Sequence, residues 1–369
     1  PKSSLETNED VRKKVEQFKE DLDTKVIFFN CALVDYEPSF YRSYKLNEKD
    51  QLEVDRSNTH QVGKYELRFD TKKNPYIDIG LNKSEKIIGG IRKNRKDIFL
   101  VGFKTTCGAS KQEMYEKGLR LCKESSVNLV LVNDTKTRWN MIVTPEEAAY
   151  HETDNREEVL RNLVDMAYYR SQLTFTQSTV IEGNPILWSS SLIPSNLREV
   201  INYCINGKAY KPFNGSTVGH FAVKLSDTEF LTSIRKSNFN DLANTGMVYV
   251  KTSGPDTVLA YGAKPSVGGQ SQRIVFFFFF GFDCIVHFYC SFKVNHSDDI
   301  SVVSQRNVEC GSFACGQQTS NGLRQFGNLK AVMLDKHGPN IVFSKNTDPK
   351  EVIKFIEDNF ELTEKTGGY

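Results

Sequence analysis

The segment FDCIVHFYC, residues 282–290, places one histidine inside an otherwise apolar run. If this run is a strand, its side chains alternate between two faces, so His287 shares a face with Asp283, Ile285 and Tyr289. A buried imidazole without a partner costs about 1–3 kcal/mol. His287 is therefore a metal ligand, one half of a lost ligand pair, or a core histidine whose hydrogen bonds are satisfied.

Polar side chains also end three apolar runs in the first half of the chain. Asp35 ends KVIFFNCALVDY, with Lys45 ten residues later, and Thr105 follows DIFLVGF. Asn133 and Asp134 end VNLVLVND. Ligands of open α/β sheets bind beyond the carboxyl ends of the strands, so these groups together would suit a phosphate-bearing ligand. Taken singly, such residues at strand ends are more often turn formers than ligands.

The elements that must position these groups follow from periodicity. NEDVRKKVEQFKEDL, residues 8–22, repeats apolar residues at helical spacing, and Ser110 with Glu113 forms a capping box that starts another helix. A further amphipathic helix is expected over residues 155–173. Because unbroken apolar strands alternate with these helices, the first half is predicted to be a Rossmann-like α/β unit with a parallel sheet.

The second half has a different pattern. Residues 175–193 are rich in Gly, Pro and Ser and predict a domain boundary. A helix is expected from Ser195 to Gly207, and Asp348 with Pro349 predicts the start of a last one. The short apolar runs between them predict strands, which makes this half α+β; they are HFAVKL, EFLTSI, GMVYVK, TVLAYG, DCIVHF, KAVMLD and NIVFSK. Periodicity assigns no structure to Val275–Phe280.

Composition narrows the classes of partner. The chain has 369 residues, 25% of them charged and 39% hydrophobic, with a formal net charge of +2. Two domains are expected from this length, and neither nucleic acid nor a membrane is expected as a partner. The opening residues PKSSLETNED are not expected to be a signal peptide, and the eight scattered cysteines suggest reduced thiols. A cytoplasmic location is predicted.

Ordered motifs in the first half resemble phosphopantothenoylcysteine synthetase (phosphopantothenate–cysteine ligase), in the C-terminal part of that family. Cys31–Tyr36 is similar to its AAVADY motif, and its lysine-rich flap begins at the position of Lys45. Lys73–Ile77 is similar to its KNPDI motif, with tyrosine in place of the acidic residue. Val101–Thr106 is similar to its VGFAAET motif but lacks the acidic residue. Val132–Asp134 is similar to its AND motif. Counterparts of its glycine-rich opening loop and N-x-S-S-G segment are not found in this sequence.

This resemblance implies a nucleotide site. Ala32, Asp35, Phe103 and Asn133 would line the nucleotide pocket, with Phe103 beside the base, and Lys45 would be catalytic over the phosphates. The implied reaction is the joining of cysteine to 4′-phosphopantothenate in coenzyme A biosynthesis, through an acyl-nucleotide, with CTP or ATP and Mg²⁺. The alternative is that Asp35 and Lys45 form a structural ion pair or are solvated surface groups.

Residues 195–360 resemble the class II aldolase/adducin family. The segments that carry the resemblance are NGSTVGHFAVKL, FLTSIRKSNFNDL, KPSVGGQSQ, CIVHFYC, ECGSFACGQQTSNGL and LDKHGPNIVF. Enzymes of that family hold Zn²⁺ through a His-x-His pair and a third histidine before glycine, positions that here are His287, Tyr289 and His337. The catalytic acid is missing from Ser266–Gln270. The resemblance therefore implies a degenerate site, in which His287 and His337 would bind Zn²⁺ weakly and His220 could add a third nitrogen.

Together these patterns predict an α/β Rossmann-like parallel-sheet domain, residues 1–178, followed by an α+β class II aldolase-like domain, residues 192–369. The leading hypothesis for function is the ligase, assembled as a homo-oligomer. One alternative is a non-catalytic binding or assembly protein with degenerate nucleotide and metal sites. The other is a zinc-dependent sugar-phosphate aldolase or epimerase.

Overall fold

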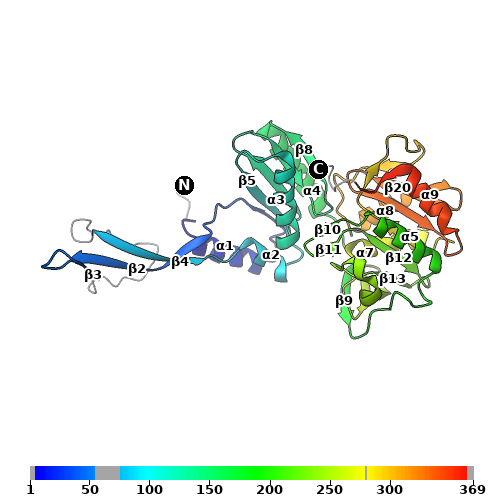
Figure 1. Ribbon diagram of the computed structural model, residues 1–369, viewed down its shortest axis with the longest axis horizontal. Coiled ribbons are helices and arrows are strands. Elements are labelled where there is room, and N and C mark those ends of the chain that lie inside the picture. The colour runs from blue at the N-terminus through cyan, green and yellow to red at the C-terminus, as the bar shows by residue number, and fades with distance from the viewer. Residues whose placement is uncertain (1–4, 55–74, 279–280, 364–369) are drawn as a thin grey trace. The chain divides into compact units, whose positions relative to one another are not determined.

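The computed structural model describes residues 5–54, 75–278 and 281–363 (Figure 1). The chain forms two compact units, Pro1–Leu100 and Val101–Tyr369. The predicted domain limits at residues 178 and 192 both lie inside the second unit. Within the described residues, no helix is both long and apolar enough to cross a bilayer.

The first unit begins with α1 (Asn8–Glu20), which a capping box of Thr7 and Asp10 starts. Val11 and Val15 are buried, as the helical pattern predicts, whereas Leu22 is 71% exposed. After β1 (Val26–Phe29), an antiparallel sheet has the strand order β3-β2-β4. Its strands are β2 (Tyr36–Leu46), β3 (Leu52–Val54) and β4 (Tyr76–Lys83), and α2 (Ile88–Asn94) follows them.

The strand predicted to run through KVIFFNCALVDY is wrong beyond Phe29. The backbone turns at once, since the Asn30 N–H donates to the Phe28 carbonyl at 3.2 Å. Further along, the Asn8 side chain at the start of α1 donates to the Val34 carbonyl at 3.0 Å and accepts from the Val34 N–H at 3.3 Å. The backbone groups of Val34 thus bond to a side chain and not to a neighbouring strand, and Tyr36 begins a separate strand.

A strand–helix–strand unit leads into the second unit. β5 (Phe99–Thr106) pairs in parallel with β6 (Leu129–Asp134), and α3 (Lys111–Ser125) connects them with the predicted Ser110–Glu113 capping box. β7 (Asn140–Val143) and β8 (Ala149–Thr153) then add antiparallel strands before α4 (Arg156–Ser171). The sheet is therefore mixed, and not wholly parallel as predicted.

The second sheet of this unit contains ten strands among the described residues, in the order β18-β20-β21-β16-β12-β13-β14-β15-β9 with β19 on β20. All the strands predicted for the second half are present. The strands are β9 (Gln177–Ile181), β12 (His220–Lys224), β13 (Glu229–Ser233), β14 (Met247–Gly254), β15 (Thr257–Tyr261), β16 (Cys284–His287), β18 (Val302–Val303), β19 (Arg324–Phe326), β20 (Leu329–Leu334) and β21 (Gly338–Phe343). β9, from the predicted linker, pairs in parallel with β15 and belongs to this sheet.

Two apolar cores cover the two faces of this sheet. α5 (Ser195–Asn206) and α9 (Pro349–Asn359) pack together over one core, while α7 (Val267–Phe278) and α8 (Phe313–Gly322) contribute to the other (Figure 1). The first part of the aromatic run, to Phe278, ends α7, where Phe276 is buried and Phe277 is 70% exposed; residues 279 and 280 lie outside the described residues. The predicted alternation in FDCIVHFYC is confirmed: Cys284 and Val286 lie in the first core and Ile285 in the second.

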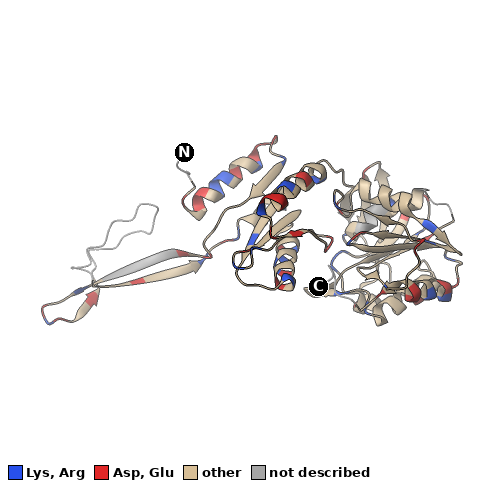
Figure 2. Cartoon of the chain, turned by 90° about the horizontal axis from the view of Figure 1, so that it is seen from above, with Lys and Arg blue, Asp and Glu red and all other residues tan. Residues whose placement is uncertain are grey.

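Charges of both signs share the exposed helix faces. Figure 2 shows acidic and basic residues close together along α1 and α9. Arg12 pairs with Glu9 on α1, and Lys354 pairs with Asp358 at 3.0 Å on α9. Exposed pairs of this kind contribute about 0–1 kcal/mol, so they favour solubility more than they stabilise the fold.

Candidate functional site

Three histidines meet inside the second unit. β12 and β16 are antiparallel neighbours whose register places His220 opposite His287, with ring centroids 4.6 Å apart. The ring of His337, from the turn before β21, lies 4.7 Å from that of His287. Their exposed fractions are 6%, 0% and 3% respectively, so all three imidazoles are buried. We call His220, His287 and His337 the histidine cluster.

Gly338 allows the turn that carries His337 to approach the end of β16. Its φ of +126° lies in the left-handed half of conformational space, and a Cβ there would overlap the carbonyl oxygen of Phe288. The close approach also sets the Tyr289 ring 5.0 Å from the His337 ring and 5.0 Å from the His287 ring. Tyr289 therefore borders the histidine cluster, as the His-x-Tyr spacing predicts.

Hydrogen bonds define the tautomer of His287. Its Nδ1–H donates to the Pro339 carbonyl at 2.8 Å, which leaves Nε2 as a bare acceptor. That Nε2 atom and both ring nitrogens of His337 are buried with no hydrogen-bond partner among the described residues. The Gln272 amide donates to His220 Nδ1, and Gln272 in turn accepts from Thr232 Oγ1 at 3.0 Å.

Burial keeps the cluster uncharged. Desolvation lowers the pKa of His287 to about 4, although the bond to Pro339 opposes this shift. Desolvation first, and then the neighbouring imidazoles, hold the pKa values of His220 and His337 well below the usual range. All three imidazoles are therefore neutral at pH 7, which is the form that binds metals.

The residue types of the cluster fit a transition metal better than their arrangement does. A ligating histidine usually donates its second ring nitrogen to a carbonyl or carboxylate, as His287 does. However, no three His, Cys, Asp or Glu side chains in the described part of the chain are placed to hold a metal ion. The rings of His220 and His287 are tilted by 30° with their centroids 4.6 Å apart, whereas zinc needs in-plane nitrogens that converge at about 2.0–2.1 Å. Metal binding by His287 and His337 stays a prediction.

Buried charges lie near Tyr289, and sequence reasoning missed them. In the turn between β7 and β8, Glu146 pairs with Arg170 of α4 at 2.5 Å, and Glu147 pairs with Lys123 of α3. Burial first, and then the nearby cysteines and these two glutamates, raise the pKa of Tyr289 well above its usual range, so the phenol stays protonated. The signal was present in TPEEAAY, where two acids interrupt an apolar stretch.

A second candidate site lies at the carboxyl end of β6. It is a cleft of about 290 Å³ lined by Asn133, Asp134, Thr135, Arg138, Asn140, Asp154 and Arg156. Asn133 is one of the residues predicted for the nucleotide pocket, and it accepts a long bond of 3.4 Å from Thr105 Oγ1. Phe103, half-buried on β5, pairs with Leu131 of the neighbouring strand. Two exposed arginines and the half-buried Asn133 amide thus line a cleft beyond a strand end.

Asp134, in contrast, acts as a turn former. Its carboxylate accepts the N–H groups of Thr137 at 2.8 Å and of Gly108 and Ala109 at 3.0 Å each. Chiefly the Thr137 bond, with the other N–H donors and Thr106, holds the pKa of Asp134 below its usual range. This carboxylate connects the start of α3 to the turn after β6, which is the structural alternative that turn chemistry predicts.

The remaining predicted ligase residues lie in the first unit. Ala32 and Asp35 are exposed in the segment between β1 and β2. Lys45 on β2 pairs with Glu53 on β3 at 3.4 Å, and both side chains are about half exposed, at 50% and 47%. The proposed pocket therefore draws residues from both compact units, and its assembly stays a prediction. Lys73 and Asn74, of the KNPDI-like motif, lie outside the described residues.

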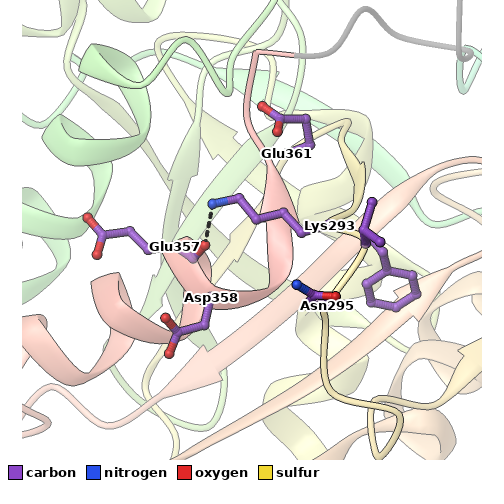
Figure 3. A pocket seen from close by; sticks show the side chains of 7 residues that line it. Lys293, Asn295, Glu357, Asp358 and Glu361 are labelled. Atoms are coloured by element: carbon purple, nitrogen blue, oxygen red, sulfur yellow. Dashed lines mark hydrogen bonds between the residues drawn. The ribbon is translucent and has the colours of Figure 1, made fainter.

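A groove beside α9 has a volume of about 540 Å³ and is lined by Phe292, Lys293, Val294, Asn295, Glu357, Asp358 and Glu361. The Lys293 ammonium donates to the Glu357 carbonyl at 2.6 Å. Figure 3 shows the carboxylates of Glu357, Asp358 and Glu361 pointing in different directions. They do not form a cation site.

No protein-family model matches the chain, and no curated protein matches it. Several solved structures are similar to parts of it. The DNA/pantothenate metabolism flavoprotein from Streptococcus pneumoniae is 16% identical, with 44% of this chain and 71% of that chain covered and a TM-score of 0.33. The C-terminal domain of the coenzyme A biosynthesis bifunctional protein CoaBC is 17% identical, with 44% and 61% covered and a TM-score of 0.28.

L-fuculose 1-phosphate aldolase is also similar, at 15% identity, with 46% of this chain and 84% of that chain covered and a TM-score of 0.32. The structural neighbours thus include proteins of both kinds that the motifs resemble. With TM-scores this low, these likenesses decide neither the family nor the activity.

Proposed function

We propose that this chain is a nucleotide-dependent ligase that joins cysteine to 4′-phosphopantothenate, with the phosphates of CTP or ATP bound in the cleft that Asn133 lines. The observation that supports this function is the composition of that cleft: two exposed arginines, Arg138 and Arg156, meet Asn133 beyond the carboxyl end of β6. Strand ends of this kind are where α/β sheets bind their ligands.

The chemistry of the cleft suits a triphosphate. One guanidinium group can donate two parallel hydrogen bonds to phosphate oxygens. Each of these bonds is stronger than a hydrogen bond between neutral groups. The Asn133 amide offers both a donor and an acceptor for the nucleoside. Asp154 is an exposed carboxylate of the same cleft and would hold Mg²⁺, which prefers carboxylate and phosphate oxygens and would neutralise part of the phosphate charge.

The reaction has two steps. A carboxylate oxygen of 4′-phosphopantothenate attacks the α-phosphorus of the nucleotide and pyrophosphate leaves, which forms an acyl-nucleotide. The amine of cysteine then attacks the acyl carbon, the nucleoside monophosphate leaves, and the amine loses a proton. Lys45 is the proposed catalytic cation, because an ammonium stabilises the charge that develops on the transferred phosphoryl group.

Calorimetric titration of the full chain with CTP and with ATP, in the presence and absence of Mg²⁺, tests the site. We expect saturable binding that weakens at least tenfold in Arg138→Ala and Arg156→Ala, since each variant loses charge-assisted phosphate bonds. Arg161→Ala is the matched control, because Arg161 pairs with Glu157 on the exposed face of the same helix as Arg156. Absence of binding, or equal affinity in all three variants, would overturn the proposal.

The histidine cluster supports a second candidate, a zinc-dependent aldolase or epimerase. The observation in its favour is the set of bare or unpartnered ring nitrogens on His287 and His337. Zn²⁺ bound there would polarise a substrate carbonyl, and these two residues would be its ligands. We expect metal analysis of the purified protein to show zinc that is lost in His287→Ala and kept in the surface variant His296→Ala.

If neither nucleotide nor zinc binds, the non-catalytic assembly protein is the function that remains. Its positive test is the oligomeric state, which light scattering measures directly. A stable homo-oligomer with no ligand binding at either site would favour it.

A further inference from the structure

An amine and a thiol meet inside the second unit, where Cys290 directly follows Tyr289, the neighbour of the histidine cluster. Lys211 Nζ lies 3.1 Å from Cys290 Sγ and 2.6 Å from the carbonyl oxygen of Leu362. Cys290 is 7% exposed and Lys211 is half-buried. A buried ammonium needs acceptors in place of water, and here one acceptor is a carbonyl and the other is sulfur. This contact joins three segments that are far apart in the sequence.

The cation distinguishes Cys290 from other buried thiols of the chain. For Cys122, Cys204 and Cys284, desolvation is the main cause that raises the pKa, so these thiols stay protonated and unreactive. A cationic donor such as the Lys211 ammonium stabilises the thiolate, which is the form that reacts with oxidants. Cys284 is the first residue of β16, in the same segment of the chain as Cys290, and offers a matched comparison.

A second observation marks the same place. Tyr210 is 5% exposed, and its hydroxyl has no hydrogen-bond partner among the described residues. Burial is the main cause that raises the pKa of this phenol well above its usual range, with smaller contributions from Cys204 and Cys290. Tyr210 and Cys290 belong to the same buried core.

We propose that Cys290 is a peroxide-sensitive modification site at which Lys211 forms a covalent sulfur–nitrogen bond. The thiolate attacks hydrogen peroxide, the O–O bond breaks, a sulfenic acid forms, and the departing hydroxide takes up a proton to become water. Sulfur is oxidised by two electrons and the peroxide is reduced.

The second step uses the adjacent amine. Lys211 Nζ, after loss of a proton, attacks the sulfur, the S–O bond breaks, and water leaves with that oxygen. The product is a sulfenamide that links residues 211 and 290, and its formation requires no further oxidant. A thiol reductant restores the free amine and thiol. This site is independent of the proposed ligase function.

Peptide mass spectrometry of the full chain after treatment with hydrogen peroxide tests the proposal. We expect a cross-linked pair of peptides containing Lys211 and Cys290, lighter than their sum by two hydrogen atoms and separated again by dithiothreitol. Cys284→Ser, the matched control, should form the same product. A disulfide between Cys204 and Cys290 in its place, or oxidation of Cys290 no faster than that of Cys284, would overturn the proposal.

Two variants of Lys211 separate the steps without disturbing the thiol. Lys211→Arg keeps a cation but not the primary amine, so dimedone, which labels sulfenic acids, should trap Cys290 while the cross-link is absent. Lys211→Met removes the cation, and we expect dimedone labelling of Cys290 to slow roughly tenfold. A cross-link that persists in Lys211→Arg would contradict the assignment of the nitrogen. Circular dichroism of each variant confirms that it is folded.

Discussion

Arg170 and Glu146 form an ion pair, 2.5 Å from Nη2 to Oε1, in which both side chains are fully excluded from solvent. Arg170 lies on α4 and Glu146 in the turn between β7 and β8. The same guanidinium donates to the carbonyl groups of Gln305 at 2.9 Å and Arg306 at 3.0 Å. The two halves of the second unit, which the sequence divides into separate domains, therefore share a buried charge.

Removal of Arg170 should strongly destabilise the second unit. We expect Arg170→Met to lower the free energy of unfolding by about 3–5 kcal/mol, because the Glu146 carboxyl group would be left in the interior without its partner. The double variant Arg170→Met/Glu146→Leu should recover most of this loss. Urea denaturation measures both, with Arg161→Ala as the exposed control at about 0.5 kcal/mol or less. Equal effects of Arg170→Met and Arg161→Ala would contradict the burial of the pair.

Gly338 should be far less tolerant of substitution than another glycine with positive φ. Gly338→Ala would place a Cβ against the Phe288 carbonyl, whereas a Cβ at Gly215, with φ +78°, would meet no atom within 4 Å. We expect Gly338→Ala to cost roughly 2 kcal/mol more than Gly215→Ala, since only the former adds a steric overlap to the backbone strain. Chemical denaturation gives this difference, and equal stabilities would show that the turn at His337 is not tightly packed.

His151 should make stability depend on pH. Arg306 Nε–H donates to His151 Nε2 at 2.9 Å, which requires that nitrogen to be unprotonated. Burial and then the Arg306 charge lower the pKa of His151 in the folded state, so the unfolded chain binds its proton more tightly. Stability from this contact is therefore complete above the unfolded pKa of about 6.5 and is lost as the pH falls.

His151→Gln keeps an acceptor that does not titrate. Between about pH 7 and pH 5 we expect the free energy of unfolding of the variant to decline less than that of the parent chain. Parallel curves for the variant and the parent chain would indicate that the Arg306 contact does not depend on the protonation of His151.

Lys45 should matter for activity and not for stability. Its pair with Glu53 is about half exposed, so Lys45→Ala should change the free energy of unfolding by about 0.5 kcal/mol or less. If Lys45 is catalytic, the same variant should lose at least about tenfold in ligase turnover, while Lys49→Ala in the adjacent turn should not. If Lys45→Ala retained its turnover, Lys45 would have no catalytic role, and its ion pair with Glu53 would be its structural role.

Local pattern was sufficient for much of the second unit. The alternation of FDCIVHFYC predicted which side chains face each core, and the pairs Ser110–Glu113 and Asp348–Pro349 predicted where two helices begin. These features depend on residues within one or two turns of each other, where sterics and capping hydrogen bonds dominate. The strand predicted beyond Phe29 failed because a side chain from α1, distant in sequence, takes the backbone bonds of Val34.

The amino-acid sequence by itself determined the helix starts, the alternating strands and the two sets of motifs, since each follows from the spacing of neighbouring residues. Only the tertiary structure decided that His220 lies beside His287, that Arg170 neutralises Glu146, and that Lys211 meets Cys290. Such contacts depend on strand register and on turns that bring distant segments within bonding range. One residue of slippage between β12 and β16 would point His220 to the opposite face of the sheet.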